Sequence, residues 1–96
     1  MKLRFTPTAI NSIEDIGEYT QAEWGIKQRD KYLDELDNAF HSLARNPKMG
    51  KECNELAPHL RRFPKDKYVI YYRIEGDFVT IIRVLHERME PERYFS

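Results

Sequence analysis

The chain has 96 residues, of which 41% are hydrophobic and 33% are charged, a composition typical of a globular protein and sufficient for one domain over residues 1–96. Sixteen basic residues balance sixteen acidic ones, so the chain lacks the basic excess of proteins that follow a nucleic-acid backbone. A single cysteine excludes an internal disulfide. No signal peptide and no apolar run of about 20 residues is recognisable, which predicts a cytoplasmic protein without a membrane partner.

The N-terminal part predicts a short strand and then a helix. Residues 2–5, KLRF, are typical of a strand. Thr6 and Pro7 indicate a helix start, because threonine caps unpaired amides and proline suits the first helical turn. Apolar residues then recur with a period near 3.6, which predicts an amphipathic helix of about sixteen residues. Gly25 is expected to end this helix, and Trp24 beside it to pack and seal a helical hairpin.

The second helix of that hairpin has a clearer pattern. Tyr32, Leu36, Phe40 and Leu43 recur at three- and four-residue steps, while acidic residues fill the other side. Pro47 prevents the helix from continuing. Because the connection around Gly25 is so short, the two helices should pack as an antiparallel pair.

The period changes from helix to strand in the second half of the chain. Residues 46–59 contain two prolines and a glycine and are expected to form a loop. Strands are predicted over residues 60–63, 68–74 and 78–86, with a tight turn at 75–77 between the last two. The expected fold class is therefore α+β, with the order β-α-α-β-β-β and a helical hairpin packed on a small antiparallel sheet in two layers.

The last predicted strand contains an unusual arginine. Strict alternation would place Arg83 on the same face as Val79, Ile81 and Leu85. A guanidinium among apolar side chains needs water, a carboxylate or an anionic partner. Two interpretations stay open, an arginine that reaches solvent beside a local acid, and an anchor for a partner's carboxylate or phosphate.

The remaining candidate residues gather in the C-terminal half. His86 could act as a general acid or base near neutral pH, although a histidine at a strand end is more often structural. Six of the nine arginines follow residue 60 and could bind RNA phosphates or an acidic peptide. The histidines and the cysteine have no metal-ligand spacing, and no glycine-rich phosphate loop occurs. No metal or other cofactor is therefore expected.

A resemblance to a known family runs through four segments, which cover almost the whole chain. They are YTQAEWG at 19–25, LARNPKMGK at 43–51, LRRFPKDKYVIYYR at 60–73 and IIRVLHERME at 81–90. Together they resemble the ParE branch of the RelE/ParE toxin superfamily. The resemblance implies the fold expected above and a toxin of a bacterial type II toxin–antitoxin operon, as in plasmid stabilisation systems.

The resemblance allows two mechanisms. RelE-like members are ribonucleases that cut mRNA in the ribosomal A site, and ParE-like members poison DNA gyrase. Val69 stands where the RelE type carries an arginine, and the LHERM ending favours ParE. The preferred hypothesis is a gyrase inhibitor that acts by binding and has no catalytic residues. If the chain is a ribonuclease instead, the implied catalytic residues are His86, Arg83, Arg88 and Tyr94.

The implied gyrase contact lies where the last strand runs into the C-terminal tail. Its candidate residues are His86, Glu87, Arg88 and Met89. The alternative mechanism replaces gyrase with the ribosome and its mRNA. A third possibility is an inactive remnant that only helps its antitoxin to repress the operon.

The second implied partner is a ParD-like antitoxin, whose C-terminal segment would wrap the toxin. Its acidic side chains could pair with arginines of the sheet. Operator DNA would be contacted only through this antitoxin. The candidate residues for the antitoxin contact are Arg61, Arg62, Arg73 and Arg83.

Overall fold

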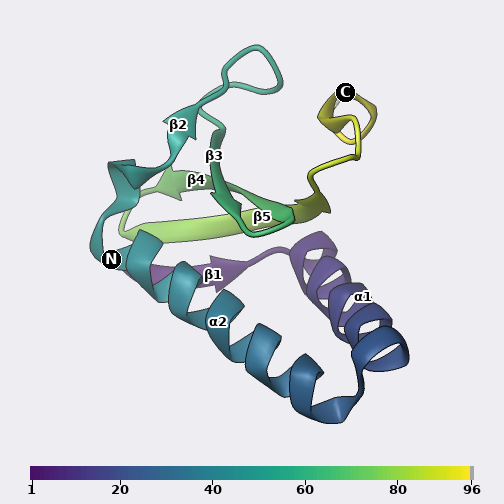
Figure 1. Ribbon diagram of the computed structural model, residues 1–96. Coiled ribbons are helices and arrows are strands. Elements are labelled where there is room, and N and C mark those ends of the chain that lie inside the picture. Colours follow the sequence, from purple (N-terminus) through teal and green to yellow (C-terminus); the bar gives the residue numbers. More distant parts are fainter. Residues whose placement is uncertain (96) are drawn as a thin grey trace.

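The computed structural model describes residues 1–95 as two helices on one face of a five-stranded sheet (Figure 1). The predicted α+β class and helical hairpin are confirmed. The bounds of the elements are β1 Lys2–Phe5, α1 Pro7–Trp24, α2 Ile26–Arg45, η1 Pro47–Met49, β2 Lys51–Glu52, β3 Arg61–Lys65, β4 Tyr68–Glu75, β5 Phe78–His86 and η2 Pro91–Arg93, where η marks a 3-10 helix.

The ends of α1 follow the predicted capping residues. The hydroxyl of Thr6 accepts a hydrogen bond from the Ala9 amide at 3.0 Å and donates one to the Ile82 carbonyl at 2.7 Å. Thr6 therefore caps the helix and also fixes its start to β5. Gly25 has a φ of +92°, which favours glycine, and its amide donates to the Gln21 carbonyl at 2.9 Å. This one residue separates α1 from α2, as expected.

The sheet is mixed rather than wholly antiparallel. Its strand order is β1-β5-β4-β3-β2, and β1 runs parallel to β5 while every other pair is antiparallel. Two parallel neighbours need a long crossover connection between them. The chain between β1 and β5 provides it, because it contains both helices and the strands β2 to β4. The predicted loop at residues 46–59 also contains β2, a two-residue strand paired with β3. It was missed because two residues carry no detectable period.

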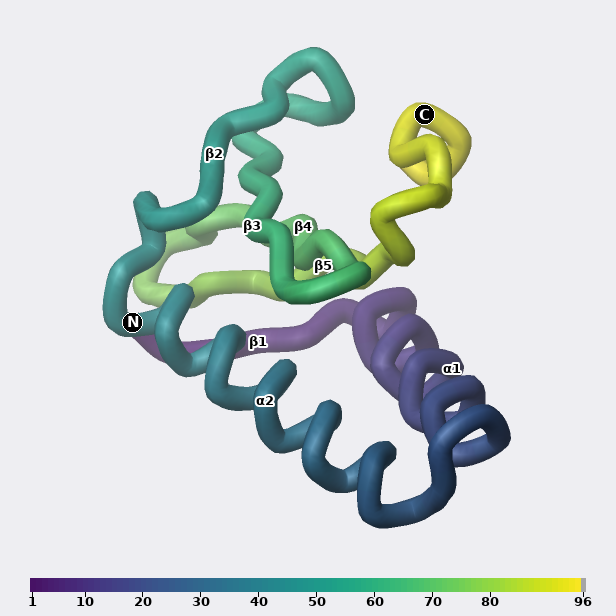
Figure 2. Tube along the Cα trace, viewed as in Figure 1, coloured from purple at the N-terminus to yellow at the C-terminus, as the bar shows by residue number. Residues whose placement is uncertain are grey.

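The sheet separates two apolar clusters. The larger lies between the sheet and the helices, and buries Leu36, Phe40 and Leu43 of α2 against Ile70 and Tyr72 of β4, among others. The smaller lies on the other face, which we call the open face. It is covered in part by the segment between β2 and β3 and by the C-terminal segment, both on the side away from the helices (Figure 2). Its buried members are Cys53, Leu60, Val69, Tyr71 and Leu85.

A β-bulge in β5 changes which face its last residues occupy. Tyr71 pairs with Arg83 but Tyr72 pairs with Ile81, so Ile82 is an extra residue in β5. Ile81 packs in the helix-side cluster, whereas Ile82 and Leu85 pack on the open face. The expectation that Arg83 shares a face with Ile81 is therefore wrong. The bulge moves Arg83 and Leu85 to the open face.

No helix within residues 1–95 has both the length and the apolar character needed to cross a bilayer.

Candidate functional site

A wide cleft lies on the helix side of the sheet, at the end where the helical hairpin extends past the strands. It has a volume of about 530 Å³, and we call it the aromatic cleft. Its walls come from the C-terminal half of α1, the N-terminal half of α2, the β3–β4 turn and the end of β5. The lining residues are Tyr19, Thr20, Trp24, Gln28, Lys31, Tyr32, Glu35, Asp66, Lys67, Tyr68, His86, Glu87 and Arg88.

Aromatic rings in mutual contact form the floor of this cleft. The ring of Tyr68 lies 5.3 Å from that of His86 in an edge-to-face arrangement and 5.7 Å from that of Tyr32. The Tyr32 hydroxyl donates a long, 3.5 Å hydrogen bond to the Lys65 carbonyl, which links α2 to the β3–β4 turn. Burial, followed by the nearby Asp66 carboxylate, raises the pKa of Tyr32. Tyr32 therefore stays neutral in the physiological range and serves as a wall rather than a base.

The hydrogen bonds of His86 restrict what its imidazole can do. The Arg88 backbone amide donates to Nδ1 of His86 at 3.1 Å. A backbone amide only donates, so Nδ1 carries no proton, and in the neutral ring the proton is on Nε2. The remaining ring nitrogen is thus a hydrogen-bond donor. This arrangement suits binding better than general-base catalysis, which needs an unprotonated nitrogen facing the substrate.

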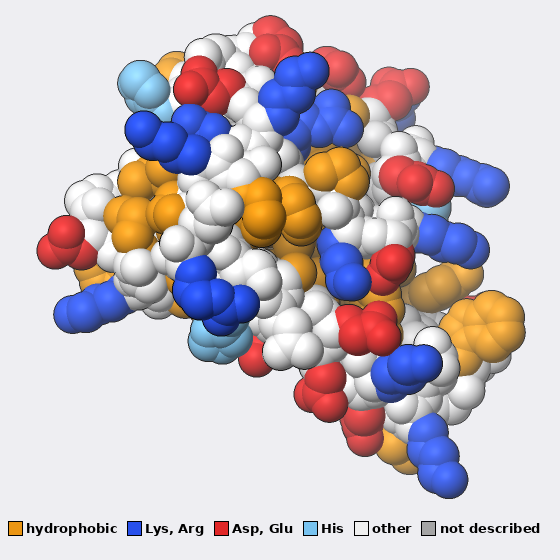
Figure 3. Space-filling view, turned by 60° about the vertical axis from the view of Figure 1, so that its left-hand side comes forward, with side chains coloured by type: hydrophobic (Ala, Val, Ile, Leu, Met, Phe, Trp, Pro, Cys, Tyr) orange, Lys and Arg blue, Asp and Glu red, His pale blue; other side chains and the backbone are white. Residues whose placement is uncertain are grey.

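The outer wall of the cleft exposes large apolar side chains. Trp24 is 72% exposed and Tyr19 is 60% exposed. The prediction that Trp24 packs and seals the hairpin is therefore wrong, because α1 and α2 diverge from the sheet there and no element of residues 1–95 covers the indole. Figure 3 shows hydrophobic side chains beside basic and acidic ones at the protruding end of the hairpin. Trp24 and Tyr19 were missed as binding candidates, since an aromatic residue at helical spacing usually indicates core.

Three of the four gyrase-contact candidates line the aromatic cleft, namely His86, Glu87 and Arg88. Met89 lies just beyond them and is exposed, with its amide donating to the His86 carbonyl at 2.9 Å. The sequence thus located one end of this cleft. Its other walls come from the helices and the β3–β4 turn, which sequence reasoning did not connect to His86.

The antitoxin-contact candidates lie mostly on the open face. Arg62 and Arg83 both pair with Tyr71, whose side chain belongs to the open-face cluster, and Arg73 follows Tyr71 by two residues on the same strand. Nε of Arg73 donates to the Pro58 carbonyl at 3.0 Å, and the guanidinium of Arg83 lies 5.1 Å from the centre of the Tyr94 ring. Arg62 is exposed and forms no ion pair with any of residues 1–95.

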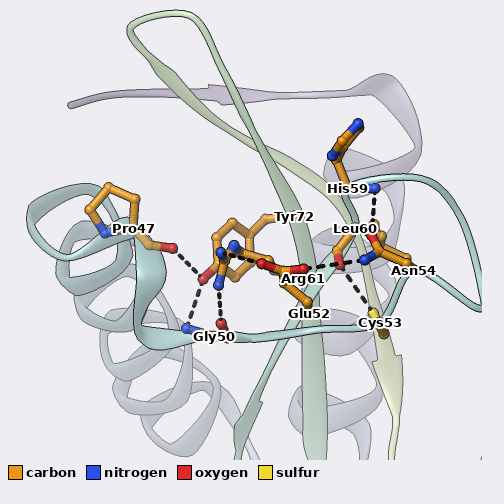
Figure 4. Close-up of polar contacts among 9 residues, drawn as sticks. All are labelled: Pro47, Gly50, Glu52, Cys53, Asn54, His59, Leu60, Arg61 and Tyr72. Atoms are coloured by element: carbon orange, nitrogen blue, oxygen red, sulfur yellow. Dashed lines mark hydrogen bonds and ion pairs between the residues drawn. The ribbon is translucent and has the colours of Figure 1, made fainter.

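Arg61 is separated from the other three and is held by internal contacts (Figure 4). Its guanidinium donates to the Gly50 carbonyl at 2.7 Å and pairs with Glu52 at 3.1 Å. The Tyr72 hydroxyl donates to the Pro47 carbonyl at 2.7 Å and accepts from the Gly50 amide at 2.8 Å. A side chain at Gly50 would place its Cβ 2.6 Å from Cε1 of Tyr72, so this position has no room for one. Arg61 therefore fixes the β2 segment.

The residues implied for a ribonuclease are not brought together. His86 and Arg88 line the aromatic cleft, while Arg83 and Tyr94 contact each other on the open face. Cys53 is buried, and desolvation raises the pKa of its thiol, which opposes formation of a nucleophilic thiolate. Within residues 1–95, no three His, Cys, Asp or Glu side chains converge in a way that could hold a metal ion.

Comparisons with known proteins agree on one family. The family model described as ParE toxin of type II toxin–antitoxin system, parDE, matches residues 3–91. Toxin ParE1 of Mycobacterium tuberculosis is 35% identical over 89 residues, covering 92% of this chain and 91% of the relative. Toxin ParE1 of Caulobacter vibrioides is 35% identical over 93 residues, covering 97% and 96%.

Solved structures confirm the fold. A chain of the chromosomal ParDE system from P. aeruginosa aligns with a TM-score of 0.78 at 17% identity, covering 90% of this chain and 95% of that one. A chain of the RelBE2 toxin–antitoxin complex of Mycobacterium tuberculosis aligns with a TM-score of 0.67 at 24% identity, covering 88% and 95%. Both likenesses show the shared fold, and the family match across residues 3–91 decides the branch. The chain belongs to the ParE family, the toxins of type II toxin–antitoxin systems.

Proposed function

We propose that this toxin inhibits DNA gyrase by binding it in the cytoplasm, blocks replication in this way, and is neutralised by a ParD-like antitoxin. The observation that carries the proposal is the arrangement at the end of β5. His86, Glu87 and Arg88 line an aromatic cleft suited to binding, and the unprotonated nitrogen of the neutral His86 ring is already occupied by the Arg88 amide. A concave aromatic surface whose histidine already has its unprotonated nitrogen occupied fits a protein that acts by docking.

The surroundings of Val69 oppose the ribonuclease alternative. The RelE type carries an arginine at this place, but Val69 is 6% exposed and packs among the apolar residues of the open-face cluster. A ribonuclease needs cations near the scissile phosphate, because they stabilise the negative charge that develops there during cleavage. Val69 supplies no such cation. The candidate catalytic residues are also divided between the two faces of the sheet. A third role, as a non-toxic co-repressor, predicts that expression of the chain leaves growth unaffected.

The open face is the proposed seat of the antitoxin. It combines partly buried apolar residues, such as Leu56 and Ile82, with the cations Arg62, Arg73 and Arg83. An amphipathic segment with aliphatic and acidic side chains complements both features. Operator DNA would then be reached only through the antitoxin.

The mechanism is tested by incubating the purified chain with gyrase and supercoiled DNA, and in parallel with ribosomes translating a defined mRNA. We expect gyrase-dependent accumulation of cleaved DNA and an intact message. His86→Ala separates the alternatives further, because a ribonuclease of this type would lose its cleavage. Cutting of mRNA by the native chain that His86→Ala abolishes would refute the proposal.

The antitoxin seat is tested by charge reversal. Arg62→Glu should weaken binding of the antitoxin encoded beside the toxin about tenfold or more, since it replaces an attraction with a repulsion. Arg45→Glu, at the exposed end of α2, is the matched control and should bind as the native chain does. Equal affinities for both variants would place the antitoxin elsewhere.

A further inference from the structure

We infer that the aromatic cleft docks a protruding peptide segment of the target protein, with one bulky apolar side chain in the cleft and acidic residues beside it. The inference rests on the proposed function, since it takes gyrase as the target. It extends the contact from the end of β5 to the helical hairpin. Trp24, Tyr19, Lys31 and Lys67 become contact residues in addition to His86 and Arg88.

The size and walls of the cleft indicate a single large anchor. Its volume of about 530 Å³ exceeds that of one aromatic side chain, and the rings of Tyr32, Tyr68 and His86 form its floor. Trp24 and Tyr19 stand exposed at its wall. Exposed aromatic side chains around a concave site are typical of protein-binding surfaces, where such residues contribute most of the affinity.

The charges at the rim indicate what flanks the anchor. Lys31 of α2, Lys67 of the β3–β4 turn and Arg88 all line the cleft. Among residues 1–95, no carboxylate lies within 4.0 Å of any of these three cationic groups. Asp66, by contrast, already faces Lys65 at 3.7 Å. Acidic side chains on either side of the anchor would complement three cations that have no acidic partner within residues 1–95.

The acidic residues of the rim favour a protein over a nucleic acid. Glu35 and Glu87 line the cleft together with the cations. A phosphate backbone would be repelled by both, and the chain as a whole has no basic excess. A peptide can place a basic side chain opposite each of them, whereas a nucleic acid has none to offer.

The cleft and the open face lie on opposite sides of the sheet. His86 and Tyr68 contact each other on the helix side, whereas Arg62 and Arg83 pair with Tyr71 on the open face. Changes in the cleft should therefore leave antitoxin affinity unaltered. A variant that fails to fold would lose affinity for both partners. Unchanged antitoxin affinity therefore shows that a cleft variant is still folded.

The test measures the affinities of purified gyrase and of the antitoxin for the native chain, a cleft variant and a matched control. The cleft variant combines Trp24→Ala with Lys31→Glu, both at exposed positions of the hairpin. The control is Ile10→Ala, which removes an exposed apolar side chain of α1 that does not line the cleft. We expect the cleft variant to bind gyrase at least about tenfold more weakly and the antitoxin within about twofold of native.

Three results would overturn the inference, and they separate it from the proposed function. If the native chain and the cleft variant bind gyrase equally, the cleft is not the docking site, although gyrase remains the target. If the native chain does not bind gyrase, the proposed function fails and this inference fails with it. If the native chain binds a fluorescent single-stranded oligonucleotide and the cleft variant does not, the cleft takes nucleic acid rather than protein.

Discussion

The two faces of the sheet differ in how they are covered. The helix-side cluster buries eleven residues, from α1, α2 and the strands β4 and β5, whereas the open-face cluster buries five beneath a loop and the C-terminal segment. Area removed from water sets most of the folding free energy, so the helix side should supply most of the stability. The residues of the open face are less completely covered and should contribute less to the folding free energy. They are therefore available to contact a partner.

The same contrast explains why the aromatic cleft is at one end of the helix side. Leu36 and Leu43 of α2 pack in the core. The hairpin extends beyond the sheet at the connection between α1 and α2 (Figure 1), and Trp24, the last residue of α1, is 72% exposed. Side chains that face the helices at this end, such as His86, therefore meet a cleft instead of a packed core. One face thus provides both the stable core and, past the limit of the sheet, a concave surface.

The largest expected effect tests the difference in stability directly. Leu36→Ala removes a side chain that is 1% exposed on the helix side, and should lower the free energy of unfolding by about 2–5 kcal/mol. Leu56→Ala, at a half-buried position on the open face, should cost about 1 kcal/mol. Urea denaturation of both variants measures the two values. Equal costs would contradict the proposed asymmetry.

The next effect concerns a residue that links the core to the β2 segment. Tyr72→Phe leaves the Gly50 amide without its hydrogen bond and should cost about 1–3 kcal/mol. Tyr71→Phe is the matched control, because the Tyr71 hydroxyl forms no hydrogen bond within residues 1–95. Thermal melting should show a clear drop for the first variant and little for the second. Similar melting temperatures would mean that the Tyr72 hydroxyl does not hold this segment.

A smaller effect is expected at the start of α1. Thr6→Ala removes the cap on the Ala9 amide and the bond to the Ile82 carbonyl, and should cost about 0.5–2 kcal/mol. Thr6→Ser keeps both bonds and should restore most of the stability. Chemical denaturation monitored by circular dichroism compares the three chains. A serine variant as unstable as the alanine variant would show that packing of the threonine methyl matters more than capping.

The smallest effect lies at the solvent-exposed edge of the open face. The Thr80 hydroxyl, and after it the Arg4 guanidinium, hold the pKa of Glu75 below its ordinary value of 4.5. A lowered carboxyl pKa stabilises the fold above pH 4.5, and this contribution is lost as the pH falls through the folded-state value. Glu75→Gln should therefore melt slightly lower than native at pH 7, and the difference should shrink as the pH falls below 4.5. A difference in melting temperature that stays constant as the pH falls would exclude this carboxylate as its source.

Much of the fold follows from local patterns in the sequence. Thr6, Pro7 and Gly25 mark the ends of α1 through local capping and backbone preferences. The apolar period of α2 identifies the face that packs on the sheet. These features depend on residues within a few positions of one another. That is why α1, the end of α2 and the three longer strands were predicted close to their observed bounds.

The missed features depend on contacts between distant residues. Trp24 is exposed because the hairpin extends beyond the sheet. The residues near Trp24 in the sequence do not determine how far it extends, so this exposure could not be predicted from them. The internal role of Arg61 depends on the path of the β2 segment, so a count of arginines could not reveal it. The aromatic cleft combines α1, α2 and β5, and only its last part, at His86, could be identified from sequence.

The bulge at Ile82 determines which face of the sheet each of the last residues of β5 occupies. If the same residues alternated strictly, with Ile82 as an ordinary member of the strand, Arg83 would point into the helix-side core. Deleting Ile82 would remove the bulge and leave Arg83 and Leu85 on the open face, because both would then follow Ile81 in regular alternation. An alignment to a relative without this bulge therefore needs a one-residue gap at Ile82, because an ungapped alignment would match each later residue of β5 with one from the opposite face of the sheet.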